Sequence, residues 1–571
     1  MSKKLSGIGA SNGISIAKVY ILNEQPIVIS NSNVSDVQKE LEIIENSIIK
    51  AKKDLEGLQK IALEKLGEEK AAIFEAHASI LEDPAMAEEF TALVKDKKYN
   101  AAKAIKEVAD KYIVMFQSMD DAYFQERAAD VKDVTERLIR YILNLPVADL
   151  ATINEEVIIV AEDLTPSQTA QLNPKFVKGF ACNIGGRTSH AAIMARSLEI
   201  PAVLGLKTIL NSVKENDILA IDGESGEVEV NPKNKEDWDK LAQNFAKEKE
   251  ELKTFKDKPT LTKDGFDGFL LEGNIGSPKD IESVLENGGE GIGLFRSEFL
   301  YMDNDHFPTE EEQFIAYKQV VEGMQGKLVI IRTLDIGGDK KLSYFKFPEE
   351  MNPFLGYRAI RFTMDRKDIF KDQIRALLRA SAFGPVGIMF PMIATVDEFL
   401  AAKKFTLDCK ADLEKDGHKI GKDLEIGMMV EIPAAAVNAE NFAKHADFFS
   451  VGTNDLIQYT MAADRMSENV TYLYQPYNPS ILKLLKMTID GAHKHGKWAG
   501  MCGEMAGEPQ AIPLLMGLGL DAYSMSATSI LKARSIMSKL TMSETQELAK
   551  NALDCETAEQ VLELVSNLLN K

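Results

Sequence analysis

The sequence IGMMVE at residues 426–431 is followed by FFSVGT at residues 448–453, and both are short apolar runs that lead into polar residues. Runs of this length between helical or loop segments are typical of buried parallel strands. Six similar runs flank them: LLEGNIG from 270, GIGLFR from 291, LVIIR from 328, GIMFPM from 387, WAGMCG from 498 and AYSMS from 522. Strands that alternate with helices in this way predict a (β/α)8 barrel over residues 261–571.

Polar side chains stand at the C-terminal ends of these predicted strands, where barrel enzymes carry their functional groups. They are Arg296, Arg332, Glu431, Asn454, Asp455 and Cys502. Guanidinium groups bind phosphate and carboxylate oxygens, and Glu and Asp oxygens suit Mg²⁺. One such residue alone is usually a surface or ion-pair residue, and a lone Cys is usually a buried apolar group. Agreement across several strand ends favours an anion pocket with a metal, which Arg358 and Arg465 are candidates to extend.

A second group of functional residues is the sequence GGRTSH at residues 185–190, between the strand-like FVKGFACNI and the helical AAIMARSLEI. Glycines allow close backbone approach, and free N–H groups and hydroxyls at a helix start bind phosphate oxygens. The positive end of the helix dipole disfavours an imidazolium, so we expect His190 to be neutral and nucleophilic. A His at a helix start more often caps the helix, but the glycines and hydroxyls here favour a phosphoryl acceptor.

The N-terminal part of the chain shows three kinds of pattern. Residues 5–22 read as a loop leading into a strand, and residues 34–144 repeat apolar positions at helical spacing. Residues 146–232 alternate short strands with short helices, and residues 233–258 are dense in charge without Gly or Pro. We therefore predict an α/β domain (1–22 plus 146–232), an inserted all-α helical domain (23–145), a helical linker (233–260) and the barrel (261–571).

Composition excludes several functional classes for this chain. Its 571 residues carry a formal net charge of −21, which would repel nucleic acid and anionic lipid. The four cysteines form neither a disulfide framework nor a CxxC metal motif. No secretory leader or membrane-spanning run is evident, so we expect a cytoplasmic protein without membrane insertion or nucleic-acid binding.

The motifs GGRTSHAAIMAR, MVEIPAA, GTNDLIQY and GMCGEMAG, in this order, resemble those of the phosphoenolpyruvate-utilising enzymes. Within this family the chain is similar, over essentially its whole length, to the members that start the bacterial sugar phosphotransferase system. The resemblance implies a multidomain α/β architecture: a swivelling phosphohistidine domain with an inserted helical domain, followed by a C-terminal TIM barrel.

The resemblance also implies a role for each candidate residue. His190 would receive the phosphoryl group and Cys502 would protonate the enolate carbon to give pyruvate. Phosphoenolpyruvate would be bound by Arg296, Arg332, Asn454, Asp455 and Arg465, and Mg²⁺ by Glu431 and Asp455. We expect the α/β domain to swing on the linker, because His190 must reach two sites.

Three partner and function expectations follow from the same resemblance. The acceptor would be a histidine-containing phosphocarrier protein that docks on the helical domain near IFEAHASILEDPAM, residues 73–86. We also expect a homodimer through the barrel domain. One alternative is an enzyme like pyruvate phosphate dikinase or phosphoenolpyruvate synthase, although no glycine-rich nucleotide loop is seen beside the His domain. The other is a silent regulatory docking protein, which intact His190 and Cys502 argue against.

Overall fold

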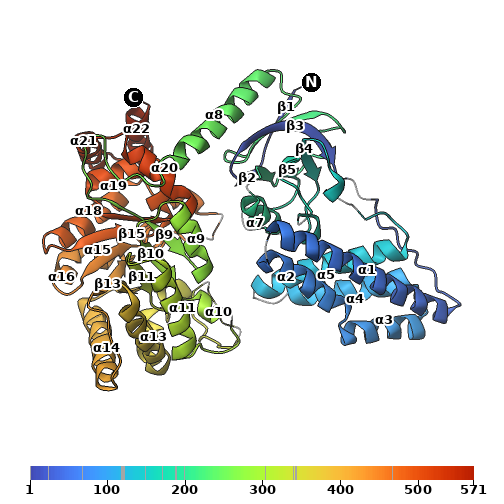
Figure 1. The fold of residues 1–571 in the computed structure, drawn as a ribbon, viewed down its shortest axis with the longest axis horizontal. Coiled ribbons are helices and arrows are strands. Elements are labelled where there is room, and N and C mark those ends of the chain that lie inside the picture. Colours follow the sequence, from blue (N-terminus) through green and yellow to red (C-terminus); the bar gives the residue numbers. More distant parts are fainter. Residues whose placement is uncertain are drawn as a thin grey trace. The chain divides into compact units, whose positions relative to one another are not determined.

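The computed structural model describes all residues except 1, 23–24, 67, 118–121, 148–149, 170, 187–188, 199, 303, 339, 341, 343, 466, 468 and 571. The chain divides into two compact units, residues 1–248 and residues 249–571 (Figure 1). The first unit contains an α/β domain and a bundle of helices, and the second contains a closed barrel. The predicted multidomain α/β fold class is therefore confirmed.

The α/β domain is built on an eight-stranded mixed sheet with the order β1-β8-β7-β3-β4-β5-β6-β2. Side chains of β4 alternate between two apolar cores: Ile159 packs into one and Ile158 into the other, so both faces of the sheet are covered. The strands are β1 (Lys3–Ser6), β2 (Ile8–Ser11), β3 (Ile14–Ile21), β4 (Val157–Ala161), β5 (Val177–Cys182), β6 (Ala202–Leu204), β7 (Ile218–Asp222) and β8 (Glu227–Val230). The short helices are η1 (Leu150–Thr152), α6 (Pro166–Thr169) and α7 (His190–Ser197).

The N-terminal segment differs from the prediction, which was a loop that leads into one strand over residues 5–22. Residues 3–6 and 8–11 are strands β1 and β2, which pair antiparallel with β8 and β6 at the two ends of the sheet. Their Gly and Ser residues suggested a loop, but each strand gains a ladder of hydrogen bonds from a partner that is about 190 to 230 residues away in sequence. Local composition carries no information about such pairing.

The helical bundle inserted between β3 and β4 packs around one apolar core that includes Leu55, Phe74 and Val108. Its helices are α1 (Val37–Leu66), α2 (Glu68–Leu81), α3 (Pro84–Lys97), α4 (Ala101–Gln117) and α5 (Ala122–Ile142). Pro84 is the first residue of α3, and the side chain of Asp83 caps that helix. Helix α8 (Lys235–Lys253) follows the sheet; Trp238 is its only buried side chain.

The second unit is a closed barrel of eight parallel strands, in the order β9-β10-β11-β12-β13-β14-β15-β16. All eight predicted strands are present: β9 (Leu270–Ile275), β10 (Ile292–Arg296), β11 (Val329–Arg332), β12 (Val386–Phe390), β13 (Leu424–Val430), β14 (Phe448–Val451), β15 (Trp498–Met501) and β16 (Ala522–Met525). Inside the barrel, Phe448 stacks on Trp498 and packs beneath Cys502 in a small interior core.

Helices cover the outside of the barrel and bury a large apolar core against the strands (Figure 1). The α-helices are α9 (Ile281–Glu286), α10 (Phe299–Met302), α11 (Glu310–Gly323), α12 (Ile360–Asp365), α13 (Lys367–Ala380), α14 (Val396–Lys415), α15 (Pro433–Val437), α16 (Ala439–Ala443), α17 (Thr453–Met461), α18 (Pro479–His493), α19 (Ile512–Leu518), α20 (Ala527–Met537), α21 (Met542–Leu553) and α22 (Ala558–Leu569). The 3₁₀ helices are η2 (Pro278–Asp280), η3 (Pro353–Leu355), η4 (Ser381–Phe383), η5 (Thr471–Leu473) and η6 (Glu504–Gly507).

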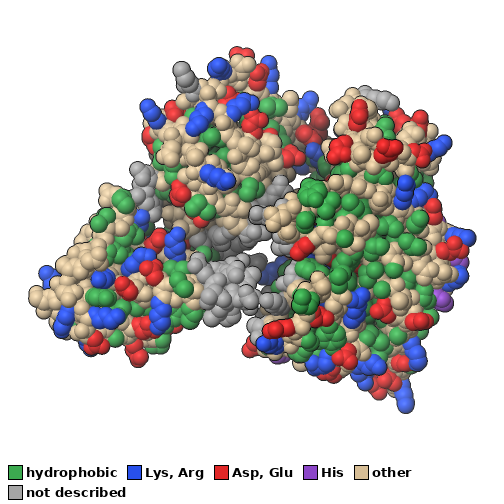
Figure 2. Space-filling model, turned by 180° about the vertical axis from the view of Figure 1, so that it is seen from behind, with side chains coloured by type: hydrophobic (Ala, Val, Ile, Leu, Met, Phe, Trp, Pro, Cys, Tyr) green, Lys and Arg blue, Asp and Glu red, His purple; other side chains and the backbone are tan. Residues whose placement is uncertain are grey.

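Surface charge is mixed in both units. On the face shown in Figure 2, Lys and Arg side chains are interspersed with Asp and Glu. No helix in the described part of the chain is long and apolar enough to span a bilayer.

Candidate active site

The barrel brings most of the predicted site residues to one rim. Because all eight strands are parallel, their C-terminal ends lie at the same end of the barrel. Arg296 and Arg332 are the last residues of β10 and β11 and stand opposite each other in the strand register. The remaining residues follow directly: Glu431 after β13, Asn454 and Asp455 in the first turn of α17 after β14, and Cys502 after β15.

Three cations surround two buried carboxylates at this rim. Arg332 forms ion pairs with Glu298 and with Asp335, the latter at 2.9 Å. The Lys340 ammonium lies 2.7 Å from Glu298 and 3.2 Å from Asp335, and Arg358 lies 2.8 Å from Asp335. Burial would raise the pKa of Asp335, but the neighbouring cations outweigh it and hold that pKa well below its usual range. The cluster therefore keeps both carboxylates ionised and carries an excess of positive charge.

Glu431 and Asp455 form the acidic part of the rim. Glu431 is 1% exposed, and its Oε1 accepts a hydrogen bond of 2.6 Å from the backbone N–H of Met392, whose φ is 55°. Burial, followed by the charge of Asp455, raises the pKa of Glu431 to about 8. Asp455 is 7% exposed, and its Oδ1 accepts no hydrogen bond from the described residues.

These two carboxylates fit a divalent cation. Two buried carboxylates that repel each other, one with an unsatisfied oxygen, are stabilised when a cation lies between them. Among the described residues, no group of three or more His, Cys, Asp or Glu side chains could hold a metal ion. Other ligands would then come from water and substrate, as is usual for Mg²⁺ at phosphate sites.

Cys502 directly follows β15, the neighbour of β14, and belongs to the small core inside the barrel. It is 4% exposed, its carbonyl accepts a hydrogen bond of 3.0 Å from the Asn274 amide, and its Sγ lies 3.8 Å from the carbonyl oxygen of Val451. Burial raises the pKa of the thiol above its ordinary value. The thiol is therefore protonated near neutral pH and is suited to donate a proton.

The remaining predicted barrel residues are held less tightly. Arg296 is exposed at the rim, and the Asn454 side-chain oxygen accepts a hydrogen bond of 3.2 Å from the Tyr474 hydroxyl. Arg465 lies 3.9 Å from Asp455, and its backbone N–H donates to the Gln458 side chain. The barrel thus brings together every candidate except His190, which belongs to the other unit.

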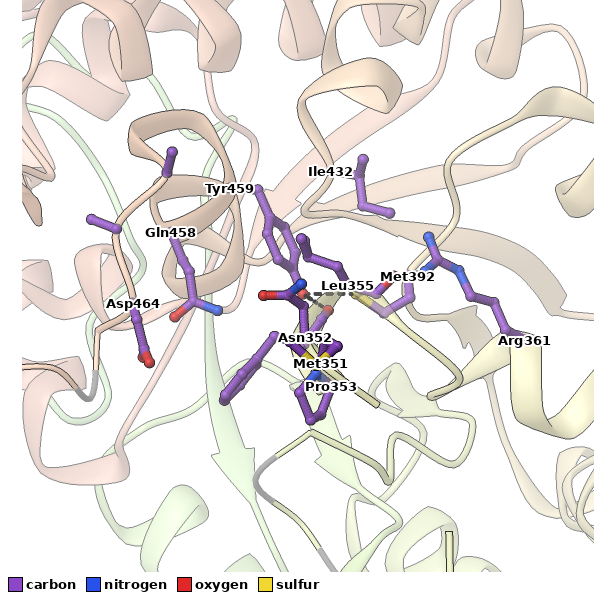
Figure 3. Close-up of a pocket in the computed structure, with 13 residues that line it drawn as sticks. Met351, Asn352, Pro353, Leu355, Arg361, Met392, Ile432, Gln458, Tyr459 and Asp464 are labelled. Atoms are coloured by element: carbon purple, nitrogen blue, oxygen red, sulfur yellow. Dashed lines mark hydrogen bonds between the residues drawn. The ribbon is translucent and has the colours of Figure 1, made fainter. Parts of the chain in front are cut away.

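A cavity of about 510 Å³ adjoins the rim (Figure 3). Tyr459 lines it and connects it to the cation cluster, because its hydroxyl donates to the Phe354 carbonyl at 2.6 Å and lies 3.4 Å from Arg358. Met392 and Ile432 also line it, next to Glu431. The walls of this cavity therefore support residues of the rim.

His190 is the first residue of α7, as the glycine pair and the hydroxyls predicted for a helix start. The Ser189 side chain caps the helix by accepting from the Ala192 N–H at 3.3 Å. Gly185 has a φ of 111°, which favours glycine, and an added Cβ would meet Leu204 at 3.1 Å. Arg187 and Thr188 lie outside the described residues, as does the side chain of His190.

Sequence reasoning missed Glu298, Asp335 and Lys340. The available signal was position: Glu298 is two residues beyond β10, and TLDIGGDK at 333–340 directly follows β11. Two glycines there, Gly337 and Gly338, adopt positive φ in a tight turn that brings Lys340 back to the rim.

The fold and the rim define a class of enzyme, and three domain families match along the chain. PEP-utilising enzyme, N-terminal, matches residues 6–127, and PEP-utilising enzyme, mobile domain, matches residues 153–226. PEP-utilising enzyme, PEP-binding domain, matches residues 249–542. The chain belongs to the phosphoenolpyruvate-utilising enzymes. The family resemblance read from the sequence motifs is confirmed.

Within this class the chain is similar over its full length to proteins named phosphoenolpyruvate-protein phosphotransferase. The protein from Mycoplasma capricolum subsp. capricolum is 61% identical over 572 residues, covering 100% of both chains. Those from Listeria innocua serovar 6a and Staphylococcus aureus strain MRSA252 are 55% and 54% identical, covering at least 99% of each chain. A solution structure of Enzyme I is 37% identical over 42% of this chain and 99% of its own, with a TM-score of 0.40.

Proposed function

We propose that this enzyme takes the phosphoryl group of phosphoenolpyruvate onto His190, releases pyruvate, and passes the group to a histidine-containing phosphocarrier protein. This would be the first step of sugar uptake by a phosphotransferase system in the cytoplasm. The observation that carries the proposal is full-length similarity, at 54–61% identity, to phosphoenolpyruvate-protein phosphotransferases. The same similarity favours this function over a nucleotide-dependent dikinase or synthase and over a silent docking protein.

Phosphoenolpyruvate would bind at the barrel rim. Its phosphate and carboxylate groups are complementary to Arg296, Arg332 and Arg465, and the side chain of Asn454 offers a further polar contact. In support, the cluster around Arg332 has more cations than carboxylates, and the buried Nε of Arg332 has no hydrogen-bond partner in the described residues.

Mg²⁺ would be held by Glu431 and Asp455, with substrate oxygens completing the site. When bound, the ion offsets negative charge on the phosphoryl group during transfer. The pKa of Glu431, about 8 without a cation, supports this assignment, because a neighbouring positive charge would favour the ionised carboxylate. Cys502 would then donate its thiol proton to the enolate carbon and complete pyruvate.

His190 would act as the nucleophile and carrier. Its position as the first residue of α7 supports this role, because the positive end of a helix dipole favours a neutral imidazole and backbone N–H groups at a helix start bind phosphate oxygens. Because the barrel rim and the helical domain belong to different units, His190 would move between the two sites on the α8 linker.

The phosphocarrier would dock on the helical domain, and the chain would form a homodimer through the barrel. Of the acidic residues in the docking region, Asp83 caps α3 and Glu82 pairs with Lys52, so both also have structural roles. Glu75 is exposed on α2 and is available to a basic partner.

Labelling with phosphoenolpyruvate that carries a radioactive phosphoryl group tests the proposal. With Mg²⁺, the full chain should acquire acid-labile, base-stable label, which a purified phosphocarrier should then remove. His190→Ala should abolish labelling, whereas a change at the exposed His306, His306→Ala, should not. Label that persists in His190→Ala would refute the assignment. Labelling by ATP would favour the dikinase or synthase alternative.

A further inference from the structure

Glu298 connects two cations of the rim through a single oxygen atom. It lies two residues beyond β10 and is 1% exposed. Its Oε1 accepts hydrogen bonds from Arg332 Nη2 and, at 2.7 Å, from Lys340 Nζ. Its Oε2 accepts none from the described residues. Burying a carboxylate is costly unless cations compensate it, so the contacts of Oε1 set where both cations lie.

Arg332 is fixed on several sides by the same region. The Ser297 hydroxyl donates to the Arg332 carbonyl at 2.6 Å, and Gln373 donates to that hydroxyl at 3.0 Å. Asp335 pairs with Nη1 at 2.9 Å, and Nη1 also lies 3.8 Å from the Met429 sulfur. These contacts leave the guanidinium little freedom to rotate. Its buried Nε is a donor without a hydrogen-bond partner in the described residues.

We infer that Glu298 is a positioning residue for phosphoryl transfer: it holds the Arg332 guanidinium and the Lys340 ammonium in the arrangement that receives phosphoenolpyruvate. The inference rests on the proposed function, because Arg332 must bind the substrate. Glu298 is itself a carboxylate and would repel an anionic substrate, so it acts through the two cations that it contacts.

Removing the Glu298 carboxylate has two effects, one of charge on KM and one of position on kcat, and kinetics can separate them. In Glu298→Gln the loss of a negative charge favours binding of an anionic substrate, which lowers KM. The neutral amide oxygen of Gln can accept from both cations, but more weakly than a carboxylate oxygen does, so Arg332 and Lys340 are held less firmly and shift, which lowers kcat. A misplacement near 1 Å costs roughly 10- to 100-fold in rate. Positioning therefore predicts a large fall in kcat with KM unchanged or lower, whereas a charge effect alone lowers KM only.

The experiment measures the rate of phosphoenzyme formation against phosphoenolpyruvate concentration for the full chain with Mg²⁺. Glu298→Gln should lower kcat roughly 10- to 100-fold without raising KM, and Glu298→Asp, which keeps the charge, should recover part of the rate. The matched control is Glu310→Gln. Glu310 bridges Arg375 and Arg379 at 2.6 and 2.7 Å, away from the rim, and its loss should leave both constants unchanged.

A double variant separates positioning from a structural role. If Glu298 acts through Arg332, adding Glu298→Gln to Arg332→Lys should slow the reaction much less than it slows the unmodified chain. A kcat within twofold of the unmodified chain, or fully multiplicative effects in the double variant, would overturn the inference. Thermal melting identifies a variant that is merely unfolded, and Glu298→Asp then serves as the test. If Arg332→Lys alone leaves kcat and KM unchanged, the proposed substrate site fails instead.

Discussion

At the scale of single residues, burial shifts the pKa of two rim groups in the same direction, although their proposed roles differ. It raises the pKa of the Cys502 thiol and of the Glu431 carboxyl. A higher pKa preserves the proton that a thiol acid must donate, and it makes a carboxylate dependent on a neighbouring cation. The same buried environment therefore suits a thiol that donates a proton and a carboxyl group that ionises beside a bound cation.

A variant without the thiol tests the proposed role of Cys502 as the proton donor. In the reverse direction Cys502 would remove a proton from the pyruvate methyl group, so the chain with Mg²⁺ should catalyse methyl exchange with deuterium from D₂O. Cys502→Ala should slow this exchange about 10²- to 10⁴-fold, because general acid–base groups typically contribute that much. Proton NMR of the methyl signal measures it. Cys409→Ala, at a buried thiol on α14, is the control. An unchanged exchange rate in Cys502→Ala would remove this residue from the chemistry.

The residues of the rim were predictable to different degrees. Arg296, Arg332 and Glu431 could be found because a strand end is visible in the apolar pattern and barrel geometry gathers such ends. Glu298 and Lys340 offered only the signal of position after a strand, which is weak because a charged residue in a loop is usually exposed. Their burial depends on partners from two different loops, which sequence does not place together.

At the scale of elements, the end of β15 packs tightly on the start of α17. A Cβ added at Gly503 would lie 1.8 Å from the Thr453 hydroxyl oxygen and 2.6 Å from its backbone nitrogen. Cys502 precedes this glycine, and Asn454 and Asp455 follow that threonine. The contact therefore couples Cys502, the proposed proton donor, to Asn454 and Asp455, the proposed substrate and metal ligands.

Gly503→Ala should accordingly impair activity more than stability alone explains. Thr453 must move to admit the methyl group, which displaces Asn454 and Asp455, so we expect KM for phosphoenolpyruvate to rise at least about tenfold. Steady-state kinetics with thermal melting measures both effects. Gly57→Ala is the control, since nothing lies near an added Cβ on α1, and it should leave kinetics unchanged and stability equal or slightly higher. Unaltered kinetics in Gly503→Ala would contradict the coupling.

Strand β9 carries another buried carboxyl, which the proposed chemistry does not use. Glu272 is 2% exposed and lies among Gly291, Gly293 and Ser524. Burial, followed by the charges of Glu290 and Glu425, raises its pKa to about 8, from an ordinary value of 4.5. Between these values the folded chain holds a proton that the unfolded chain has lost. Its contribution to stability is therefore complete below pH 4.5 and is lost as pH rises through 8.

Glu272→Gln should remove this dependence. The amide is neutral at every pH. The melting temperature of Glu272→Gln, relative to that of the unmodified chain, should therefore rise between pH 6 and pH 8.5. The free-energy difference should grow by up to about 1.4 kcal/mol per pH unit below the folded pKa. Melting scans at the two pH values measure it. Glu282→Gln, at an exposed position on α9, should show no such trend. A difference independent of pH would mean that Glu272 is ionised in the fold.

At the scale of the whole molecule, α8 is anchored separately in each unit. Near its start, the Trp238 indole donates to Glu229 at 3.0 Å in the first unit. Just beyond its end, buried Arg534 donates to the carbonyls of Phe255 and Lys256 at 2.9 and 3.2 Å in the second. Its 19 residues span about 28 Å as a helix, and most of its side chains are exposed. If His190 moves as proposed, the exposed part of α8 would accommodate that movement, because both of its ends are anchored.

This tether predicts that His190 serves the barrel of its own chain. A linker of this kind holds the two units at about millimolar effective concentration, so transfer within a chain should greatly exceed transfer between chains at micromolar enzyme. Arg332→Ala retains His190 but lacks a proposed substrate-binding group, and His190→Ala retains the barrel. Mixed at about 1 µM each, with labelled phosphoenolpyruvate and Mg²⁺, they should label at less than about 1% of the unmodified rate, and this rate should rise with concentration. Fast labelling that is independent of concentration would show that partner chains exchange their His190 units, and the within-chain shuttle would be wrong.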